Sequence, residues 1–423
     1  MCYVVIFTYV VCYTGNMDVD FPVLDLEELK SAFASGGVEE CRRLLERKRD
    51  EWKDIPLNVA VIGNSDVDRF SFINAIRGLT ADDERTAGVD VIKTTIDIES
   101  YSHPNNPLLK FWELPGVGTV HFPRQTYLSD IDFDRFDFFL LLTADRFTEN
   151  DTWLGNELSK RKKKHFFVRT NIGVDIECNK KAHPRTHDEE AVLKEIRESI
   201  QHRLRIHNVS VFLIDRYKIK KFDFDKLKLR LLEEFPKLKK TALVLSLQAT
   251  CEGMLRLKVA ELRSRMWKLA ALSGAVAAPV PGLSTVFDLS IVTNEAKFYF
   301  TQLGLDETSL KRFSKLTSTD YQQLQSTVDS CLDCRIVGTE GLKKHIVDLL
   351  KRADPVLTSA AVDVDSKFVP LLGSFIAAPL SFGGTYYALK LVLDKMESAA
   401  LEVIQFAAET RKHSAYVGSG LIP

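Results

Sequence analysis

The chain has 423 residues, of which 45% are hydrophobic and 27% are charged, a composition typical of a globular protein that can bury a large core. Its 57 basic and 58 acidic residues balance to a formal charge of -1, so composition gives no strong field for nucleic acid or an anionic membrane. The seven cysteines are scattered rather than paired, which indicates reduced intracellular thiols and not a disulfide framework.

Residues 1–13 are almost wholly apolar but too short for a membrane-spanning helix, which takes about 20 residues. They also lack the basic start and small-residue cleavage site of a secretory signal. We expect an extension here, with Met17 as an alternative start. From residue 25 to 52 the apolar spacing predicts two short helices, separated by Gly36 and Gly37.

Between residues 58 and 214 short apolar runs alternate with helical patterns. Five runs are expected to be strands, at residues 94–98, 108–112, 136–143, 165–169 and 209–214. The first two are predicted to be neighbours joined across a turn-rich segment at 101–107, and residues 189–205 predict an amphipathic helix. This alternation predicts a three-layer α/β domain with a mostly parallel sheet.

After residue 236 the pattern is helical, with one long helix predicted at 241–272 and a small-residue turn or hairpin at 271–283. Further helices are predicted at 287–303, 309–316 and 321–330. Residues 371–393 are apolar but interrupted by glycines and by Pro379, which predicts a buried helical hairpin rather than a membrane span. Peripheral membrane contact through small apolar helices stays open.

The segment from residue 59 to 76 predicts a strand, a loop and a helix, which is the arrangement of a phosphate-binding loop, G-x-x-x-x-G-K-[ST]. Gly63 is the first glycine, and the last three positions hold Asp68, Arg69 and Phe70. Asp68 adds a carboxylate, Arg69 changes the shape of the cation, and Phe70 removes the hydroxyl that binds Mg²⁺. Ser71 comes one position late, and the intervening residues are Asn64, Ser65, Asp66 and Val67.

Two later segments stand where a nucleotide switch and a base-recognition motif would lie. Glu113 replaces the metal-side aspartate of an Asp-Leu-Pro-Gly switch, while Gly116 keeps the amide that could meet a γ-phosphate. Thr170 begins the second segment, where Thr-Lys-x-Asp would be expected. There Asn171 replaces the lysine that stacks on the purine, and Gly173 replaces the aspartate that selects guanine.

Other patterns are interpreted without a site. The basic run at residues 160–164 is expected to be a solvated helix end. Cys178, His183 and His187 have a spacing that suggests metal ligands, but Pro184 spoils the helical pair, so no metal site is expected.

Together these segments resemble the immunity-related, interferon-inducible GTPases over residues 50–316. The resemblance is carried by SFINAIRG (71–78), AGV (87–89), YSHP (101–104), LPGVGT (114–119), RFTEND (146–151), FVRT (167–170), PRTHDEE (184–190), PGLS (281–284) and GLDE (304–307). It implies a Ras-like or dynamin-like G domain of the P-loop NTPase fold, plus a helical domain formed by the N- and C-terminal helices. The implied divisions are 1–54, 55–237 and 238–423.

Carried over position by position, the resemblance implies a vestigial nucleotide site at Gly63 to Ser71, Thr95, Glu113, Gly116, Thr170, Asn171 and Gly173. The fifth motif, Ser-Asn-x-Asp in the family, reads Asp215, Arg216, Tyr217 and Lys218. Since four of the five motifs are altered at their working residues, the chain resembles the quasi-GTPase (Q-type) members. The implied cofactor is GTP or GDP with Mg²⁺, but the altered loop argues against it, and no catalytic residue is expected.

The leading hypothesis is therefore a non-catalytic or weakly nucleotide-binding protein that regulates cell-autonomous immunity or membrane traffic. Its expected partners are family-type GTPases or other proteins that bind a face of the G domain, with no nucleic acid. The alternative is an active, membrane-associated immune GTPase that hydrolyses GTP. A third hypothesis is a scaffold that docks a partner through residues 371–393. We expect a cytoplasmic location, with or without peripheral attachment to intracellular membranes.

Overall fold

The computed structural model describes residues 23–63, 69–80, 83, 98–144, 147–204, 210–215, 218–219, 221–277, 283–333, 341–342, 344–346, 348–349 and 373–417. The chain divides into two compact units. The sheet unit comprises residues 52–254 and 310–321, and the helical unit comprises 1–51, 255–309 and 322–423. A helical domain built from both ends of the chain is thereby confirmed, while the residue boundaries expected after 54 and 237 stay a prediction.

The described part of the sheet unit contains a six-stranded sheet in the order β2-β3-β1-β4-β5-β6. Its strands are β1 (Leu57–Gly63), β2 (Glu99–His103), β3 (Asn106–Leu114), β4 (Phe138–Thr143), β5 (His165–Arg169) and β6 (Val211–Leu213). Only β2 runs antiparallel, against β3, and the other described pairs are parallel. The prediction of a mixed, mostly parallel sheet is confirmed. Because β1 lies between β3 and β4, its carboxyl end meets the end of β3 at one sheet edge.

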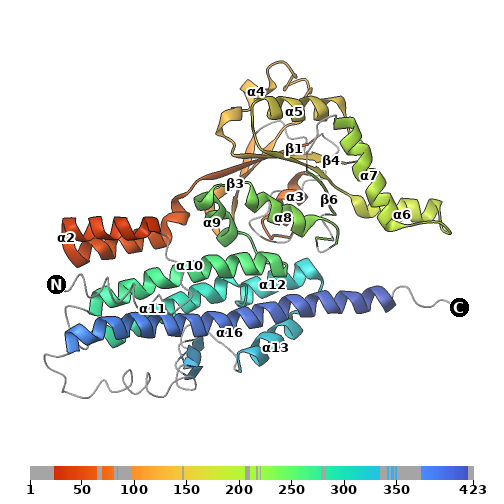
Figure 1. Cartoon of the computed structure of the whole chain (residues 1–423). Coiled ribbons are helices and arrows are strands. Elements are labelled where there is room, and N and C mark those ends of the chain that lie inside the picture. The colour runs from red at the N-terminus through yellow and green to blue at the C-terminus, as the bar shows by residue number, and fades with distance from the viewer. Residues whose placement is uncertain are drawn as a thin grey trace. The chain divides into compact units, whose positions relative to one another are not determined.

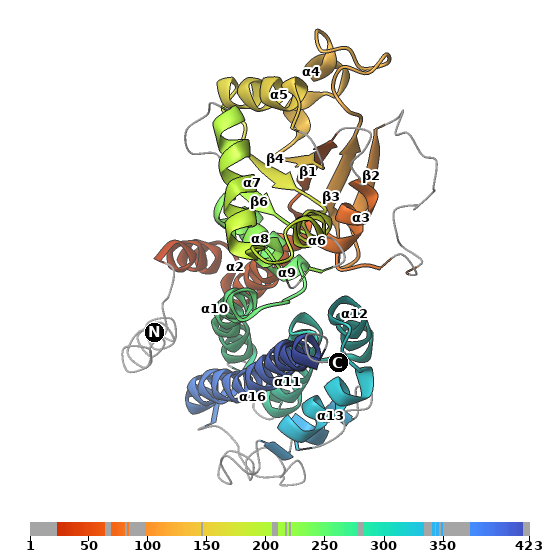
Figure 2. The same ribbon diagram turned by 90° about the vertical axis from the view of Figure 1, so that its right-hand side faces the viewer.

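Helices cover both faces of this sheet (Figures 1 and 2). On one face α4 (Tyr127–Asp130), α5 (Glu149–Lys160), α6 (Ile172–Ala182) and α7 (Glu189–Leu204) bury apolar side chains with Ala60 and Ile62 of β1. On the other face Phe72 of α3 (Arg69–Ile76) packs edge-to-face on Phe224 of α8 (Phe224–Glu233). Successive strand residues point to opposite faces, so the apolar runs of the sequence fill both layers.

The β2–β3 hairpin differs from its prediction. The strand expected at 94–98 lies outside the described residues except for Ile98, which is not in a strand. Tyr101 to His103, expected in the turn, belong to β2, so the connection shrinks to Pro104 and Asn105. Pairing with β3 explains the difference, because Tyr101 lies opposite Phe111 in an antiparallel ladder whose backbone hydrogen bonds a loop would lack.

The helix expected at 241–272 is broken in the structure. It forms α9 (Lys237–Ser246) and α10 (Glu252–Ala277), with Leu247 extended at ψ 143°. The break is held by tertiary contacts: Leu247 is fully buried, and the Thr250 hydroxyl donates to Asp225 of α8 at 2.6 Å. A helical pattern cannot reveal such a break, because it depends on a side chain twenty-five positions away.

The described part of the helical unit is built from α2 (Val23–Asp50), most of α10, α11 (Leu283–Gln302), most of α13 (Tyr321–Cys331) and α16 (Gly373–Val417), while α12 (Glu307–Thr317) lies mostly in the sheet unit. The helices α10, α11 and α16 run side by side (Figures 1 and 2). In α2, Gly37 has φ 66° and ψ -150°, so the predicted separation of two helices at this glycine pair is confirmed. Two short 3-10 helices, η1 (Glu51–Asp54) and η2 (Phe133–Arg135), complete the elements of known bounds.

The prediction of a helical hairpin at 371–393 is wrong. The structure has one continuous helix of 45 residues, α16, which passes through Pro379 and the glycines. Beyond residue 384 its apolar stripe continues at helical spacing through Leu389, Val392, Met396 and Val403, all buried. Packing of this stripe stabilises a continuous helix, which outweighs the local preference of proline and glycine for a break. In the part of the chain that the structure describes, no helix is long and apolar enough to cross a membrane.

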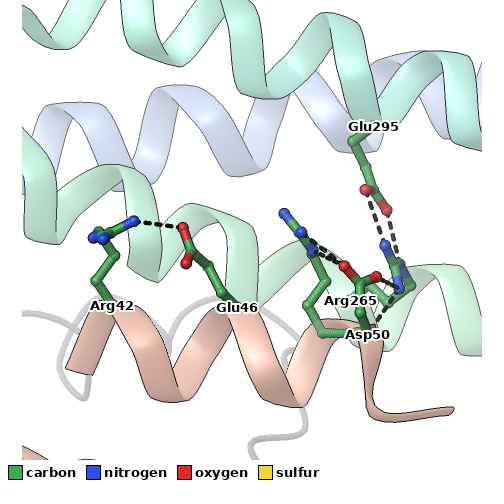
Figure 3. A network of polar contacts seen from close by, with 6 residues as sticks. Arg42, Glu46, Asp50, Arg265 and Glu295 are labelled. Atoms are coloured by element: carbon green, nitrogen blue, oxygen red, sulfur yellow. Dashed lines mark hydrogen bonds and ion pairs between the residues drawn. The ribbon is translucent and has the colours of Figure 1, made fainter. Parts of the chain in front are cut away.

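A buried polar network joins three helices of this unit (Figure 3). Arg265 of α10 donates to both carboxylate oxygens of Glu295 on α11, at 2.9 and 3.1 Å. The same guanidinium donates to the backbone oxygen of Arg49 at 2.7 Å and lies 3.7 Å from Asp50, in the last turn of α2. Because the last carbonyls of a helix lack partners within it, this contact caps α2 and fastens it to α10 and α11.

Candidate nucleotide site

Gly63, Arg69 and Glu113 meet at the carboxyl edge of the sheet. Arg69 is the first residue of α3, and its Nε donates to Oε1 of Glu113 at 3.0 Å. Its Nη1 donates to the backbone oxygen of Gly63 at 2.7 Å. The two side chains are 6% and 0% exposed, so this is a buried ion pair between the positions of the phosphate-binding lysine and the switch aspartate.

The pair uses the geometry of arginine. A lysine carries its charge on one nitrogen, whereas the arginine fork reaches the end of β1 and the side chain of β3 at once. The cation that a phosphate-binding loop directs at the outer phosphates is therefore directed at the protein. A phosphate group entering here would have to separate the pair and leave the buried carboxylate of Glu113 beside it, which is electrostatically unfavourable.

Phe70 fills the position of the magnesium-binding hydroxyl with a ring. It is buried and packs edge-to-face on Tyr101 of β2, with ring centroids 6.3 Å apart. Arg77, the residue that follows α3, lies over the ring of Tyr101 and donates to the backbone oxygen of Ser102 at 2.9 Å. Burial, with the hydrogen bond to Glu99, raises the pKa of Tyr101 above its ordinary value. The start of α3 is thus packed against β2 by aromatic contacts.

The segment that follows Glu113 is held by hydrogen bonds within the sheet unit. The Tyr127 hydroxyl donates to the Pro115 carbonyl at 2.7 Å, and burial raises the pKa of Tyr127, which keeps its proton in place. Asn150 donates to the Val117 carbonyl at 2.9 Å. Gly118 has φ 81°, and its amide donates to the Phe122 carbonyl at 2.9 Å. These three hydrogen bonds hold the segment through contacts within the sheet unit.

The base side of the site is formed by residues after β5. The Thr170 amide donates to the Thr143 carbonyl at 2.8 Å, and its hydroxyl donates to the same oxygen at 3.2 Å. Asn171 precedes α6 with φ 61°, a conformation that asparagine tolerates better than most residues. Gly173 is buried in the first turn of α6, directly against the side chain of Asp215.

Asp175, two residues beyond the specificity position, has another partner. Its carboxylate accepts a hydrogen bond from Nη2 of Arg169 at 2.8 Å, and the arginine side chain is 9% exposed. Its recruitment to a purine would therefore require this ion pair to break. The basic run at 160–164 begins at the last residue of α5, and four of its five residues are exposed, as expected for a solvated helix end. Lys163 donates to the carbonyls of Asp134 and Phe136, and Lys164 pairs with Glu234.

The structure thus groups the described site residues into two clusters. Gly63, Arg69 and Glu113 form one, with Phe70, Ser71 and Gly116 on the same segments, while Thr170, Asn171 and Gly173 form the other. Asn64, Ser65, Asp66, Val67, Asp68 and Thr95 lie outside the described residues. Sequence reasoning missed two contacts, Arg69 with Glu113 and Gly173 with Asp215. At positions 173 and 215 one motif has lost an aspartate and another has gained one, and this exchange was the available signal. Arg69 and Glu113 keep the charges of the residues they replace, so the sequence carried no sign of their contact.

Magnesium-bound GTP does not fit the phosphate side of this arrangement. The only oxygen of Phe70 is its backbone carbonyl, so the ring offers no ligand to Mg²⁺, which is bound by oxygen. Arg69, the first residue of α3, and Glu113 of β3 are bound to each other.

The strand β1, the following loop, the helix α3 and the parallel sheet around them define the class, a G domain of the P-loop NTPase fold. The family model described as interferon-inducible GTPase (IIGP) matches residues 23–356. The chain belongs to this family, and the resemblance of the sequence analysis is confirmed.

Individual relatives match over most of the chain. Interferon-gamma-inducible GTPase 10 of Mus musculus is 30% identical over 379 residues, 89% of this chain and 87% of that protein. Interferon-inducible GTPase 5 of Bos taurus is 32% identical over 383 residues, 90% and 81% of the two chains. Among solved structures, Era in complex with MgGDPNP and ribosomal RNA nucleotides aligns with a TM-score of 0.28 at 16% identity, over 51% of this chain and 66% of Era. That likeness is too distant to bear on the site.

Proposed function

We propose that this family member is a non-catalytic, GTPase-shaped protein that acts through protein contacts of its G domain, in cell-autonomous immunity or membrane traffic. One observation carries the proposal: Arg69 is paired with Glu113 and bound to the Gly63 carbonyl. The Arg69 guanidinium, which would bind the outer phosphates, and the Glu113 carboxylate, which would bind the metal, neutralise each other. The altered hydroxyl position at Phe70 supports the same conclusion, because hydrolysis needs a bound Mg²⁺.

The proposal gives the ion pair a positive role as well. In a nucleotide-dependent switch, the γ-phosphate and its metal hold the loop, the helix and the switch segment together. Here Arg69 links the end of β1 to β3, and the Tyr127 and Asn150 hydrogen bonds hold the segment beyond. The G domain would then present one constant surface to family-type GTPases or other proteins, with no nucleotide cycle.

Calorimetric titration of the full chain with GTP and GDP in the presence of Mg²⁺ tests this function, together with a phosphate-release assay. We expect no release above the buffer rate and no micromolar binding. Micromolar affinity for either nucleotide would overturn the proposal. The buried pair in the other unit supplies a matched control, since Glu295→Gln should alter stability and leave the titration unchanged.

The second candidate is an active, membrane-associated GTPase, which the family match and the names of the relatives favour. It requires that the Arg69–Glu113 pair open when nucleotide arrives. In that case Arg69→Ala would abolish phosphate release, and flotation with vesicles of anionic lipids would depend on GTP. Release that is already at background in the unaltered chain excludes this candidate.

A further inference from the structure

The two edge strands of the described sheet, β2 and β6, differ in how their outer backbone groups are bound (Figure 2). In β6 these groups belong to Val211 and Leu213, which alternate with the residues that bond to β5. Nη1 of Arg197 donates to the Val211 carbonyl at 2.6 Å. The Leu213 amide donates to Oδ2 of Asp223 at 3.0 Å, and the Leu213 carbonyl accepts from the Asp223 amide at 2.9 Å. An arginine and an aspartate thus cover the β6 edge.

The outward groups of β2 follow from the hydrogen bonds of the neighbouring strands. The amide and carbonyl of Asn58 in β1 both bond to Asp137, which directly precedes β4, so they face β4. Successive residues of a strand direct their backbone groups to opposite sides, so those of Val59 face β3, where its partner is Phe111. In a parallel pair such a residue bonds to the two residues beside its partner. The backbone groups of Phe111 itself therefore face β2.

This alternation leaves open groups on the far side of β2. Phe111 pairs with Tyr101, so the neighbours Ser100 and Ser102 direct their amides and carbonyls away from β3. Arg77 donates to the Ser102 carbonyl at 2.9 Å. Within the described residues, the Ser100 amide, the Ser100 carbonyl and the Ser102 amide have no hydrogen-bond partner. The strand also contains neither lysine nor proline, the residues that commonly protect an edge strand from pairing.

One face of the sheet beside these groups is basic. Ser100 lies opposite Trp112 and Ser102 lies opposite Lys110, so the four side chains share a face. Cζ of Arg135 lies 4.1 Å from the centroid of the Trp112 ring, and the Lys110 ammonium lies 5.9 Å from it. Among the residues that the structure describes, neither cation is paired with a carboxylate, and Nε and Nη2 of Arg135 have no hydrogen-bond partner. Since serine is small, the face between the cations and the outer side of β2 carries no bulky side chain.

We propose that the β2 edge, the side of β2 that faces away from β3, binds an extended segment of a partner protein with acidic side chains at alternate positions. The backbone of that segment would bond to Ser100 and Ser102 and add a strand to the sheet. Every second side chain would point to the basic face, about 10 Å from β3, and glutamates there would meet Lys110 and Arg135 across the serines. A second copy of this chain would bring the same two cations to the contact, so charge favours an acidic partner.

The inference rests on the proposed function, in which the G domain acts through protein contacts. It deepens that function by naming the surface and the chemistry of the partner. The covered β6 edge offers the same partner no equivalent set of groups, because Arg197 and Asp223 already bind them. The nucleotide site is not used.

The test uses the full chain and two capped peptides of eight residues, one alternating threonine with glutamate and the other alternating threonine with lysine. Amide hydrogen exchange, followed by NMR, measures binding. We expect the glutamate peptide to slow exchange at Ser100 and Ser102 and to leave Leu213 unchanged, because the Leu213 amide is already bound to Asp223. The lysine peptide should bind about fivefold more weakly, because it places like charges beside Lys110.

Two variants separate the backbone contacts from the charge. Ser100→Pro removes one outward donor without breaking the ladder, and it should abolish the effect of the peptide on Ser102. Its control is Ser100→Thr, which keeps the donor and should bind like the unaltered chain. Lys110→Glu should reverse the preference, so that the lysine peptide binds about fivefold more tightly than the glutamate peptide.

Unchanged exchange at Ser100 and Ser102 with the glutamate peptide in excess would overturn the inference. So would an equal affinity of both peptides for the unaltered chain and for Lys110→Glu, a readout that holds even if Ser100→Pro does not fold. Slow exchange that needs no peptide and increases with protein concentration would assign the edge to a second copy and overturn the acidic partner. Micromolar binding of GTP would end the proposed function and leave the peptide result standing.

Discussion

Arg69–Glu113 in the sheet unit and Arg265–Glu295 in the helical unit are both buried arginine–glutamate pairs, with N–O distances of 3.0 and 2.9 Å. They differ in the other contacts that each arginine makes. Arg265 binds both oxygens of Glu295, caps the last turn of α2 and lies 4.3 Å from the Phe298 ring centroid. Arg69 gives one nitrogen to Glu113 and another to the Gly63 carbonyl.

Two chemically similar ion pairs therefore have different roles, set by where they lie in the fold. The Arg265 pair links three helices of the helical unit, so its role is structural. The Arg69 pair lies at the positions of the phosphate-binding lysine and the switch aspartate, so under the proposed function the same chemistry closes a site. Burial and pairing alone therefore do not identify a functional residue, and the position of the pair in the fold does.

The largest loss of stability is expected when Arg265 is replaced. Arg265→Met leaves the Glu295 carboxylate buried and the end of α2 uncapped, so we expect about 3–5 kcal/mol lower stability by chemical denaturation. Arg263→Met is the control, because that side chain is 50% exposed in its pairs with Asp394 and Glu397 and should cost less than about 1 kcal/mol. Equal losses for the two variants would contradict an architectural role for Arg265.

A smaller loss is expected at the other pair. Arg69→Met leaves the Glu113 carboxylate buried, and we expect stability to fall by about 3 kcal/mol. Combining it with Glu113→Leu removes both charges and should restore most of the loss, because the isolated charge accounts for most of the cost. A double variant as unstable as Arg69→Met alone would show that the packing of the arginine, and not its charge, matters.

A pH effect is expected from Lys258, a buried lysine whose hydrogen-bond partner is a neutral side chain. Lys258, on the same helix as Arg265, donates to the amide oxygen of Gln302 at 2.9 Å, and burial lowers its pKa from 10.5 to about 7. Between these values the unfolded chain binds more protons, so stability rises with pH, by at most about 1.4 kcal/mol per pH unit, and levels off below pH 7.

Denaturation of the full chain at pH 7, 8 and 9 measures that slope against Lys258→Met. The variant has no amine to titrate, so its stability should change less over this range and should exceed that of the unaltered chain at pH 7. Parallel slopes for the two proteins would assign the pH dependence to other groups.

The smallest effect is expected in the switch segment. Tyr127→Phe removes the hydrogen bond to the Pro115 carbonyl and should cost about 1 kcal/mol. Amide hydrogen exchange should then rise at Val117 and Gly118 and stay unchanged in α16. Unchanged exchange at both places would show that this hydrogen bond does not hold the segment.

The sheet could be predicted from sequence because its strands are short apolar runs buried on both faces. The run at 165–169 is strand β5, and the helix predicted at 189–205 is α7, with Ile200 and Leu204 buried. The predictions that were wrong depended on distant contacts. Thr250 bonds to α8 where the sequence predicts an unbroken helix. The helix α16 continues through Pro379 because the apolar stripe beyond residue 384 is buried.

The sequence by itself determined the family, the parallel sheet and the motif positions that have changed, because local pattern and motif spacing carry that information. Only the tertiary structure decided what the changed residues do. Arg69 and Glu113 are 44 positions apart and Gly173 and Asp215 are 42 apart, so their contacts exist only once β1, β3 and β6 lie in one sheet. Pairing of charges and exclusion of volume act through space, and the fold alone sets those distances.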